Sequence, residues 1–275
     1  EIILYLCFEK HITLYMALLI VPDVHGRTFW EGPVDRFMHQ VDKIIFLGDY
    51  LDPYPKETDV ELENVLDNFE KIIRLKRENP ELVVLLKGNH DEHYSSETFQ
   101  ELAGGTRCDY KNWKKYHELF GSLSDFFELA YYHRINGVPY IFSHAGITTY
   151  WLKKVNRELW KMPEDHVSIA DPLITDKINQ LDFSEEGQKL LAIIGRSRST
   201  FGEKTGSILW ADVSDHESDS VNKYGFNQSF QIFGHTRLKG DLTDMIQGER
   251  FAMIDSQKCF LLDWEHDGKL KPVRE

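Results

Sequence analysis

Several features that mark specialised classes of protein are scarce in this sequence. The 275 residues include only three cysteines, Cys7, Cys108 and Cys259, which are far apart and odd in number. A disulfide framework needs paired cysteines, and such frameworks are typical of small secreted proteins. This cysteine usage therefore argues against a disulfide-stabilised secreted protein and predicts a reducing compartment, with the cytoplasm as the expected location.

Long apolar runs are also missing. No stretch reaches the roughly 18 apolar residues that a membrane-spanning helix requires, so we expect no membrane association. A cleaved secretory signal is not expected either, because charged residues interrupt the first apolar run and the second, "ITLYMALLIVP", leads directly into Asp23 and His25.

The chain shows no linker rich in proline, glycine or serine, and this favours one domain. Its first methionine is Met16, which directly precedes the apolar run "ALLIV". We therefore expect residues 1–15 to be an N-terminal extension and residues 16–275 to form a single domain. The alternative is that residues 1–15 form an ordinary first strand or helix.

Positive charge is in deficit. Lysine and arginine number 32 against 45 aspartates and glutamates, which gives a formal net charge of -13. The most basic stretch, "KNWKKYHE" at 111–118, is typical of the solvated face of a helix. Non-specific binding to nucleic acid or to an anionic membrane is therefore not expected.

What the sequence does contain is a series of short apolar runs rich in β-branched residues, each followed by polar residues. They are "ALLIV", "KIIFLGD", "LVVLLKGNHD", "YIFSHAG" and "QIFGHT". Continuous apolar runs of this length are typical of strands buried on both faces in sheets covered by helices. Helical periodicity between the runs, at 58–79, 113–129, 149–160 and 184–195, predicts an α/β fold.

Turn and capping signals add detail to this prediction. Thr58 and Glu61 have the spacing of a capping box, and Ser184 is expected to cap the helix that follows it. The pair Asn136-Gly137 lies between two strand-like runs and predicts a β-hairpin. Near the end, "FAMID" and "CFLLDW" are interpreted as a closing pair of strands.

The polar residues at the ends of the five runs are chemically similar. Each cluster combines an imidazole or a carboxylate with small residues: Asp23 and His25; Asp49 and Asp52; Asn89, His90 and Asp91; Ser143 and His144; Gly234 and His235. Any one cluster would also suit a hydrogen-bonded turn. Because ligands bind beyond the carboxyl ends of strands in open α/β sheets, five such clusters together predict a site for two divalent metal ions.

The motifs D-x-H-G, G-D-x-x-D, G-N-H-D, S-H-A-G and G-H-T, in this order, closely resemble the calcineurin-like metallophosphoesterase superfamily. The motifs "SHAG" and "ILWADV" are similar to the branch that contains serine/threonine phosphoprotein phosphatases and symmetrical dinucleoside-tetraphosphatases. The resemblance extends from about residue 17 to residue 263. It implies the calcineurin-like α/β sandwich, in which two mixed β-sheets are flanked by helices.

The resemblance also implies roles for individual residues. Asp23 and His25 would bind the first metal, and Asp49 would bridge both metals. Asn89, His144 and His235 would complete the second metal site. His90 would act as the general acid that protonates the leaving oxygen, held in orientation by Asp52.

Two positions depart from the family pattern. Many members carry a second histidine in the last motif, where this chain has Arg237, and the related phosphatases carry an arginine after G-D-x-x-D, where this chain has Pro53. Another cation should then contact the phosphate, because a guanidinium group matches its oxygens well. The candidates are Arg198 and Arg237, with Arg196 also considered.

The resemblance implies hydrolysis of phosphoric esters at a dinuclear metal centre, with a phosphorylated protein or nucleotide as substrate. We expect a phosphomonoesterase of the serine/threonine protein phosphatase type, with Mn²⁺ as the first choice of metal and Fe²⁺, Zn²⁺ or Mg²⁺ as alternatives.

The alternative function is a symmetrical dinucleoside polyphosphate hydrolase, followed by a phosphodiesterase or nuclease. A non-enzymatic scaffold is not expected, since the motif residues are all present: Asp23, His25, Asp49, Asn89, His90, His144 and His235. We consider His93 a candidate substrate contact. Residues 92–130, which are rich in aromatic side chains, form either a packed helical cap or a lid.

Overall fold

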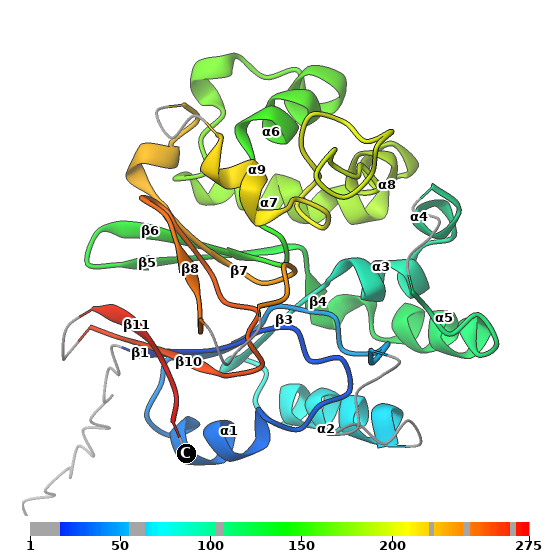
Figure 1. The fold of residues 1–275 in the computed structure, drawn as a ribbon, viewed down its shortest axis with the longest axis vertical. Coiled ribbons are helices and arrows are strands. Elements are labelled where there is room, and N and C mark those ends of the chain that lie inside the picture. Colours follow the sequence, from blue (N-terminus) through cyan, green and yellow to red (C-terminus); the bar gives the residue numbers. More distant parts are fainter. Residues whose placement is uncertain are drawn as a thin grey trace, which may run out of the picture.

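Two β-sheets lie face to face, with helices on their outer faces (Figure 1). The structure is a computed structural model that describes residues 17–54, 64–102, 107–219, 223–238, 243–264 and 268–274. The expected extension at 1–15 lies outside these residues, as does the capping box at Thr58 and Glu61. A single domain over 16–275 stays a prediction.

The first sheet has six strands in the order β11-β10-β1-β2-β3-β4. Strands β1 to β4 run parallel, whereas β10 is antiparallel to both β1 and β11. Their bounds are β1 Ala17–Val21, β2 Lys43–Phe46, β3 Val83–Leu86, β4 Phe127–Glu128, β10 Phe260–Asp263 and β11 Lys269–Pro272.

The second sheet has five strands in the order β5-β6-β7-β9-β8. Strands β6, β7 and β9 run parallel, and β5 and β8 are antiparallel edge strands. Their bounds are β5 Ala130–Ile135, β6 Val138–Ser143, β7 Phe230–Phe233, β8 Ile246–Gln247 and β9 Phe251–Met253. The two mixed sheets confirm the predicted fold class.

The helices form two groups. In Figure 1, α1 and α2 lie below the first sheet and α5 lies to its right, whereas α6 to α9 lie above the second. Their bounds are α1 Glu31–Phe37, α2 Val65–Glu78, α3 Asn89–Ser95, α4 Glu97–Leu102, α5 Trp113–Ser122, α6 Thr149–Val155, α7 Pro172–Asn179, α8 Glu185–Leu191 and α9 Val213–Glu217. A π-helical segment at Asn156–Trp160 and 3-10 segments at Ser124–Phe126, Glu164–His166, Gln180–Phe183 and Phe226–Gln228 complete the helical structure that is described.

Successive side chains of a strand point to opposite faces of its sheet and so contribute to two apolar clusters. In β1, Leu18 and Ile20 belong to the apolar cluster between the two sheets, whereas Leu19 and Val21 belong to the cluster under α1, α2 and α5. Because successive side chains of a strand point to opposite faces, a sheet covered on both sides needs such continuous apolar strands. Within the described residues, no helix is long and apolar enough to cross a membrane.

Most local predictions are confirmed. The strands follow the five apolar runs, and Asn136 and Gly137 have φ of 47° and 83° in the hairpin between β5 and β6. Ser184 accepts a hydrogen bond from the Gly187 N–H and caps α8. The helix before Pro80 ends at Glu78.

Two local predictions are wrong. The helix expected over 113–129 ends at Ser122, because the chain then turns through a 3-10 segment into β4. The closing runs "FAMID" and "CFLLDW" do not pair with each other: β9 lies in the second sheet and β10 in the first. Both runs are short and apolar, and their composition does not indicate which sheet each joins.

Candidate metal centre

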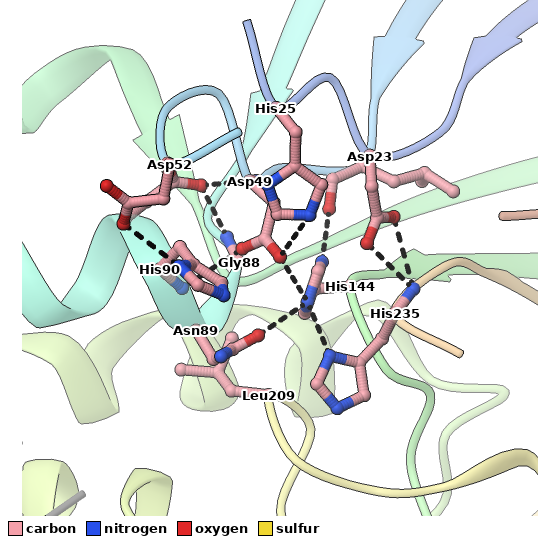
Figure 2. A network of polar contacts seen from close by, with 12 residues as sticks. Asp23, His25, Asp49, Asp52, Gly88, Asn89, His90, His144, Leu209 and His235 are labelled. Carbon is pink, nitrogen blue, oxygen red and sulfur yellow. Dashed lines mark hydrogen bonds and ion pairs between the residues drawn. The ribbon is translucent and has the colours of Figure 1, made fainter. Parts of the chain in front are cut away.

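The polar clusters meet at one edge of the two sheets. Asp23 and His25 follow β1, Asp49 follows β2, Asn89 and His90 begin α3 after β3, His144 follows β6, and His235 follows β7. Figure 2 shows Asp23, His25, Asp49, His144 and His235 directed toward one another. The structure thus brings together all of the predicted metal ligands, although they are dispersed over more than 200 residues of sequence.

Unusual backbone conformations direct these side chains inward. His25, Asp49, Asp52 and His235 have left-handed φ values of 46°, 53°, 57° and 67°. Such values are uncommon for residues other than glycine and concentrate at functional sites. Four of them among the predicted site residues indicate that local strain is maintained here by the surrounding fold.

Two glycines allow the backbone to approach the carboxylates. A Cβ atom on Gly88 would lie 2.0 Å from Asp49 Oδ1, and one on Gly234 would lie 2.1 Å from Asp23 Oδ1. The peptide N–H of His235 in turn donates to both Oδ atoms of Asp23 at 3.1 Å. The two carboxylates are therefore held against backbone that only glycine permits at these positions.

Asp49 belongs to two buried groups of candidate metal donors. The first comprises Asp23, His25 and Asp49, the second comprises Asp49, His144 and His235, and the donor atoms of each group lie within 4.8 Å of one another. A carboxylate has two oxygens, and a dinuclear site needs a bridging ligand of this kind. This donor set fits two divalent cations that share Asp49.

Hydrogen bonds behind the histidines set their tautomers. His25 Nδ1 donates to the Leu51 carbonyl at 3.0 Å, and His144 Nδ1 donates to the Leu47 carbonyl at 2.9 Å. The Nε2 atoms then carry lone pairs, and they lie 3.5 Å and 3.6 Å from Asp49 Oδ2. A backbone carbonyl behind a ring is the usual arrangement around a metal-ligating histidine.

The second donor group also includes an amide oxygen. His144 Nε2 lies 3.0 Å from Asn89 Oδ1 and 2.9 Å from His235 Nδ1. Imidazole nitrogens and amide oxygens suit divalent first-row ions. Asn89 Oδ1 therefore lies beside the second donor group, and its role as a ligand stays a prediction.

The carboxyl groups of the centre are buried close together, an arrangement that a positive charge would stabilise. Burial, reinforced by the neighbouring carboxylates Asp255 and Asp49, raises the pKa of Asp23 well above its usual value. Burial, followed by the negative charge of Asp91, raises the pKa of Asp49 well above its usual value as well. Burial lowers the pKa of His144 to about 3, so this ring is neutral near pH 7. Metal binding needs neutral imidazoles and ionised carboxylates, and a bound cation would offset the repulsion that raises the pKa of the two carboxyl groups.

His90 and Asp52 form a pair beside this centre. His90 Nδ1 lies 2.9 Å from Asp52 Oδ2, and the peptide N–H of His90 donates to Asp49 Oδ1 at 3.0 Å. Tyr94 Oη donates to the other Asp52 oxygen at 2.6 Å. Burial raises the pKa of Asp52 to about 6. Burial also lowers the pKa of His90, as does the Arg107 charge, and a hydrogen bond to the Arg107 backbone opposes both.

The predicted arginines differ in their placement. Arg198 forms an ion pair with Asp212 at 3.1 Å and donates to Thr236 Oγ1 at 2.8 Å. The Arg237 guanidinium lies 4.4 Å from the centre of the Tyr54 ring. Arg196 is exposed, and its Nε donates to the Gly202 carbonyl in its own loop.

His93 lies inside the protein rather than on a surface open to substrate. Its ring is fully buried, edge-on to Phe99 and Tyr110, and neither ring nitrogen has a hydrogen-bond partner in the described part of the chain. A role in contacting substrate stays a prediction.

Sequence reasoning missed three residues at this site. Tyr54 lies edge-on to His25 with ring centres 5.0 Å apart, and Arg107 stacks over Tyr54 at 4.0 Å. Asp255 is buried, and burial raises its pKa to about 7 against the opposing charges of Arg237, Arg27 and Arg198. Asp255 follows an apolar run, the same pattern that indicated the predicted ligands, so that signal was present. Tyr54 and Arg107 lie in irregular segments that carry no such signal.

The comparisons with known proteins agree with this geometry. A family model described as calcineurin-like phosphoesterase matches residues 16–236. No curated protein sequence matches the chain.

Two solved structures have a similar fold at low sequence identity. A cold-active protein-tyrosine phosphatase from the psychrophile Shewanella sp. shares 15% identity at a TM-score of 0.55, with 95% of this chain and 81% of that chain covered. A protein serine/threonine phosphatase from Saccharomyces cerevisiae shares 14% identity at a TM-score of 0.51, with 96% and 81% covered.

Proposed function

Since the chain belongs to the calcineurin-like phosphoesterase family and is therefore a phosphoric ester hydrolase, we propose that it hydrolyses phosphomonoesters of the serine/threonine phosphoprotein type. One observation carries this proposal: two donor groups share Asp49, and the His90–Asp52 pair lies directly beside them. Two bound divalent ions would supply Lewis acidity at the phosphoryl group and lower the pKa of an attacking water. We propose Mn²⁺ for this role, since carboxylate and amide oxygens suit it.

The residues of the chain would supply the remaining chemistry. Asp52 engages Nδ1 of His90, so a proton for the departing oxygen would come from Nε2 of the protonated ring, whose charge Asp52 would balance. Tyr94 fixes the second oxygen of Asp52, so the carboxylate cannot rotate away from the ring. An alkoxide such as that of serine is a poor leaving group, and a positioned acid helps most in its departure.

A second substrate class is favoured by a specific observation. The guanidinium groups of Arg27, Arg107 and Arg237 lie 5.9 Å, 4.0 Å and 4.4 Å from the centre of the Tyr54 ring. Guanidinium groups are preferred partners of phosphate oxygens. A symmetrical dinucleoside polyphosphate carries more than one phosphoryl group and could use several of them.

An activity panel tests these alternatives. The purified protein would be loaded in turn with Mn²⁺, Zn²⁺, Fe²⁺ and Mg²⁺, and assayed on p-nitrophenyl phosphate, bis-p-nitrophenyl phosphate, a phosphoserine peptide and diadenosine tetraphosphate. We expect turnover of the monoester and the peptide, but not of the bis ester. Preferred hydrolysis of diadenosine tetraphosphate would replace the proposed substrate class with the second one, and a preference for the bis ester would indicate a phosphodiesterase. Two bound metals without turnover of any substrate would indicate a scaffold.

A further inference from the structure

Arg107 lies between α4 and α5 and belongs to none of the five motifs that carry the predicted ligands. Its side chain nevertheless lies at the centre: one terminal nitrogen is 2.7 Å from the Asp52 carbonyl oxygen and 3.5 Å from His25 Nδ1. The rings of His25 and His90 are 5.2 Å apart. Arg107 thus lies beside both the donor group around Asp23 and the predicted acid, and a phosphoryl group must reach both.

We propose that Arg107 binds the phosphoryl oxygens of the substrate, an inference that rests on the function proposed above. The guanidinium carries five N–H donors in a planar fork. Nε and one terminal nitrogen donate to the Asp52 carbonyl at 3.2 Å and 2.7 Å, and this leaves donors for phosphoryl oxygens. Pro53, which follows Asp52, offers no side-chain donor, so a cation must come from another segment.

Four contacts fix Arg107 and the residues next to it in this position. The Tyr54 ring supports its guanidinium face at 4.0 Å. The two hydrogen bonds to the Asp52 carbonyl fix the plane of the fork. Two residues further along, the peptide N–H of Asp109 donates to Tyr94 Oη at 2.7 Å. An arginine held this way loses less side-chain entropy when it binds an oxyanion than a free one would.

The same segment is attached to the predicted acid. Tyr94 Oη, which accepts from Asp109, itself donates to Asp52, and Asp52 orients His90. Binding of a phosphoryl group by Arg107 would therefore hold the segment in the arrangement that positions His90. Arg198 is less suited to this role, because Asp212 already engages it at 3.1 Å.

Arg134 provides a matched control far from the centre. It lies in the hairpin of β5 and β6, where NH1 donates to the Gly137 carbonyl at 2.8 Å and the guanidinium lies 5.8 Å from the Tyr132 ring. These contacts are of the same two kinds as those of Arg107. Arg134→Ala therefore controls for the general loss of an arginine that stacks on tyrosine and binds a carbonyl.

The test measures binding of inorganic phosphate by calorimetry to Mn²⁺-loaded wild-type protein, Arg107→Ala, Arg107→Lys and Arg134→Ala, with metal content matched by elemental analysis. We expect Arg107→Ala to weaken phosphate binding by roughly 10- to 100-fold, the range for a hydrogen bond to a charged group. Arg107→Lys should retain part of the affinity, because it keeps the charge but loses the fork. Arg134→Ala should bind as wild type does, and added guanidinium ion should restore turnover in Arg107→Ala.

Unchanged phosphate affinity in Arg107→Ala at equal metal content would overturn the proposal. Arg107 would then have only a structural role in its segment. Should that variant fail to fold, as shown by circular dichroism, Arg107→Lys decides in the same way, since an affinity equal to wild type would refute a role for the fork. A wild-type protein that binds phosphate through Arg107 but hydrolyses no ester would contradict the proposed function alone.

Discussion

His144 Nε2 and His235 Nδ1 face each other at 2.9 Å, although the two residues follow different strands and are 91 positions apart. His144 Nδ1 donates a hydrogen bond to the Leu47 carbonyl, so Nε2 carries the lone pair of the ring and points at His235. Burial lowers the pKa of both rings. A cation shared by these two rings would satisfy the facing nitrogens, as the predicted second metal site requires.

The first prediction follows from this pair. His235→Ala should reduce the stoichiometry of tightly bound Mn²⁺ from two to one, because only the donor group of Asp49 and His144 loses a ligand. Equilibrium dialysis with elemental analysis measures the stoichiometry. His117→Ala, on α5, is the control and should retain two ions. A variant of His235 that still binds both ions with wild-type affinity would show that this ring is not a ligand.

The second prediction concerns the acid. His90→Asn should leave both metals bound but lower kcat by about 10²- to 10⁴-fold on an alkyl phosphate, the usual contribution of a positioned acid. The loss on p-nitrophenyl phosphate should be smaller, because p-nitrophenolate needs little protonation to leave. Comparing kcat for the two substrates at fixed metal content measures this difference. Equal losses on both would argue that His90 acts on the metals rather than on the leaving group.

Much of the centre could be predicted because it follows a simple rule of sheet geometry. Buried parallel strands are continuous apolar runs, and the polar residues after them must gather at one edge. Asp23, Asp49 and His144 each follow such a run, so their convergence needed no knowledge of packing. Asp255 follows the same rule, and it was missed only because its run was interpreted as part of a closing strand pair.

Other features depend on packing that no local pattern records. Arg107 reaches the centre because residues 107–109 lie beside Asp52 and Tyr94, and that placement depends on contacts such as the one between Asp109 and Tyr94. The end of α5 at Ser122 was missed for a similar reason: the residues that follow pair with β3 as β4, and tertiary pairing overrides their helical spacing.

The third prediction tests the close approach of backbone to carboxylate. A Cβ on Gly88 would lie 2.0 Å from Asp49 Oδ1, a distance that forces the predicted bridging ligand to move. Gly88→Ala should therefore weaken Mn²⁺ binding and lower the melting temperature. Gly121→Ala in α5 is the matched control, since nothing lies within 4 Å of its added Cβ. That change should raise the free energy of unfolding by about 1 kcal/mol through helix propensity. Normal Mn²⁺ affinity in Gly88→Ala would show that the carboxylate can move without cost.

The fourth prediction concerns a buried histidine outside the predicted ligand set. His216 Nε2 donates to the Ala145 carbonyl at 3.0 Å, and its ring packs 4.4 Å from that of Phe233. Burial lowers the pKa of His216 below its usual 6.5. The unfolded chain thus binds a proton at His216 more readily than the folded protein does, so protonation of this ring favours unfolding. The free energy of unfolding therefore decreases as the pH falls below about 6.5.

His216→Gln removes this titration while its amide can still donate to the Ala145 carbonyl. Between pH 6.5 and the lowered pKa, the wild-type protein should lose up to about 1.4 kcal/mol of unfolding free energy per pH unit relative to the variant. Urea unfolding of both proteins at pH 7.5, 6.0 and 5.0 measures the difference, with His39→Gln at an exposed position as the control. Parallel pH dependence in wild type and His216→Gln would mean that the buried ring accepts a proton as readily as it does in the unfolded chain. Acid sensitivity of the fold would then come from other buried histidines, and added Mn²⁺ would suppress the part that comes from the candidate metal centre.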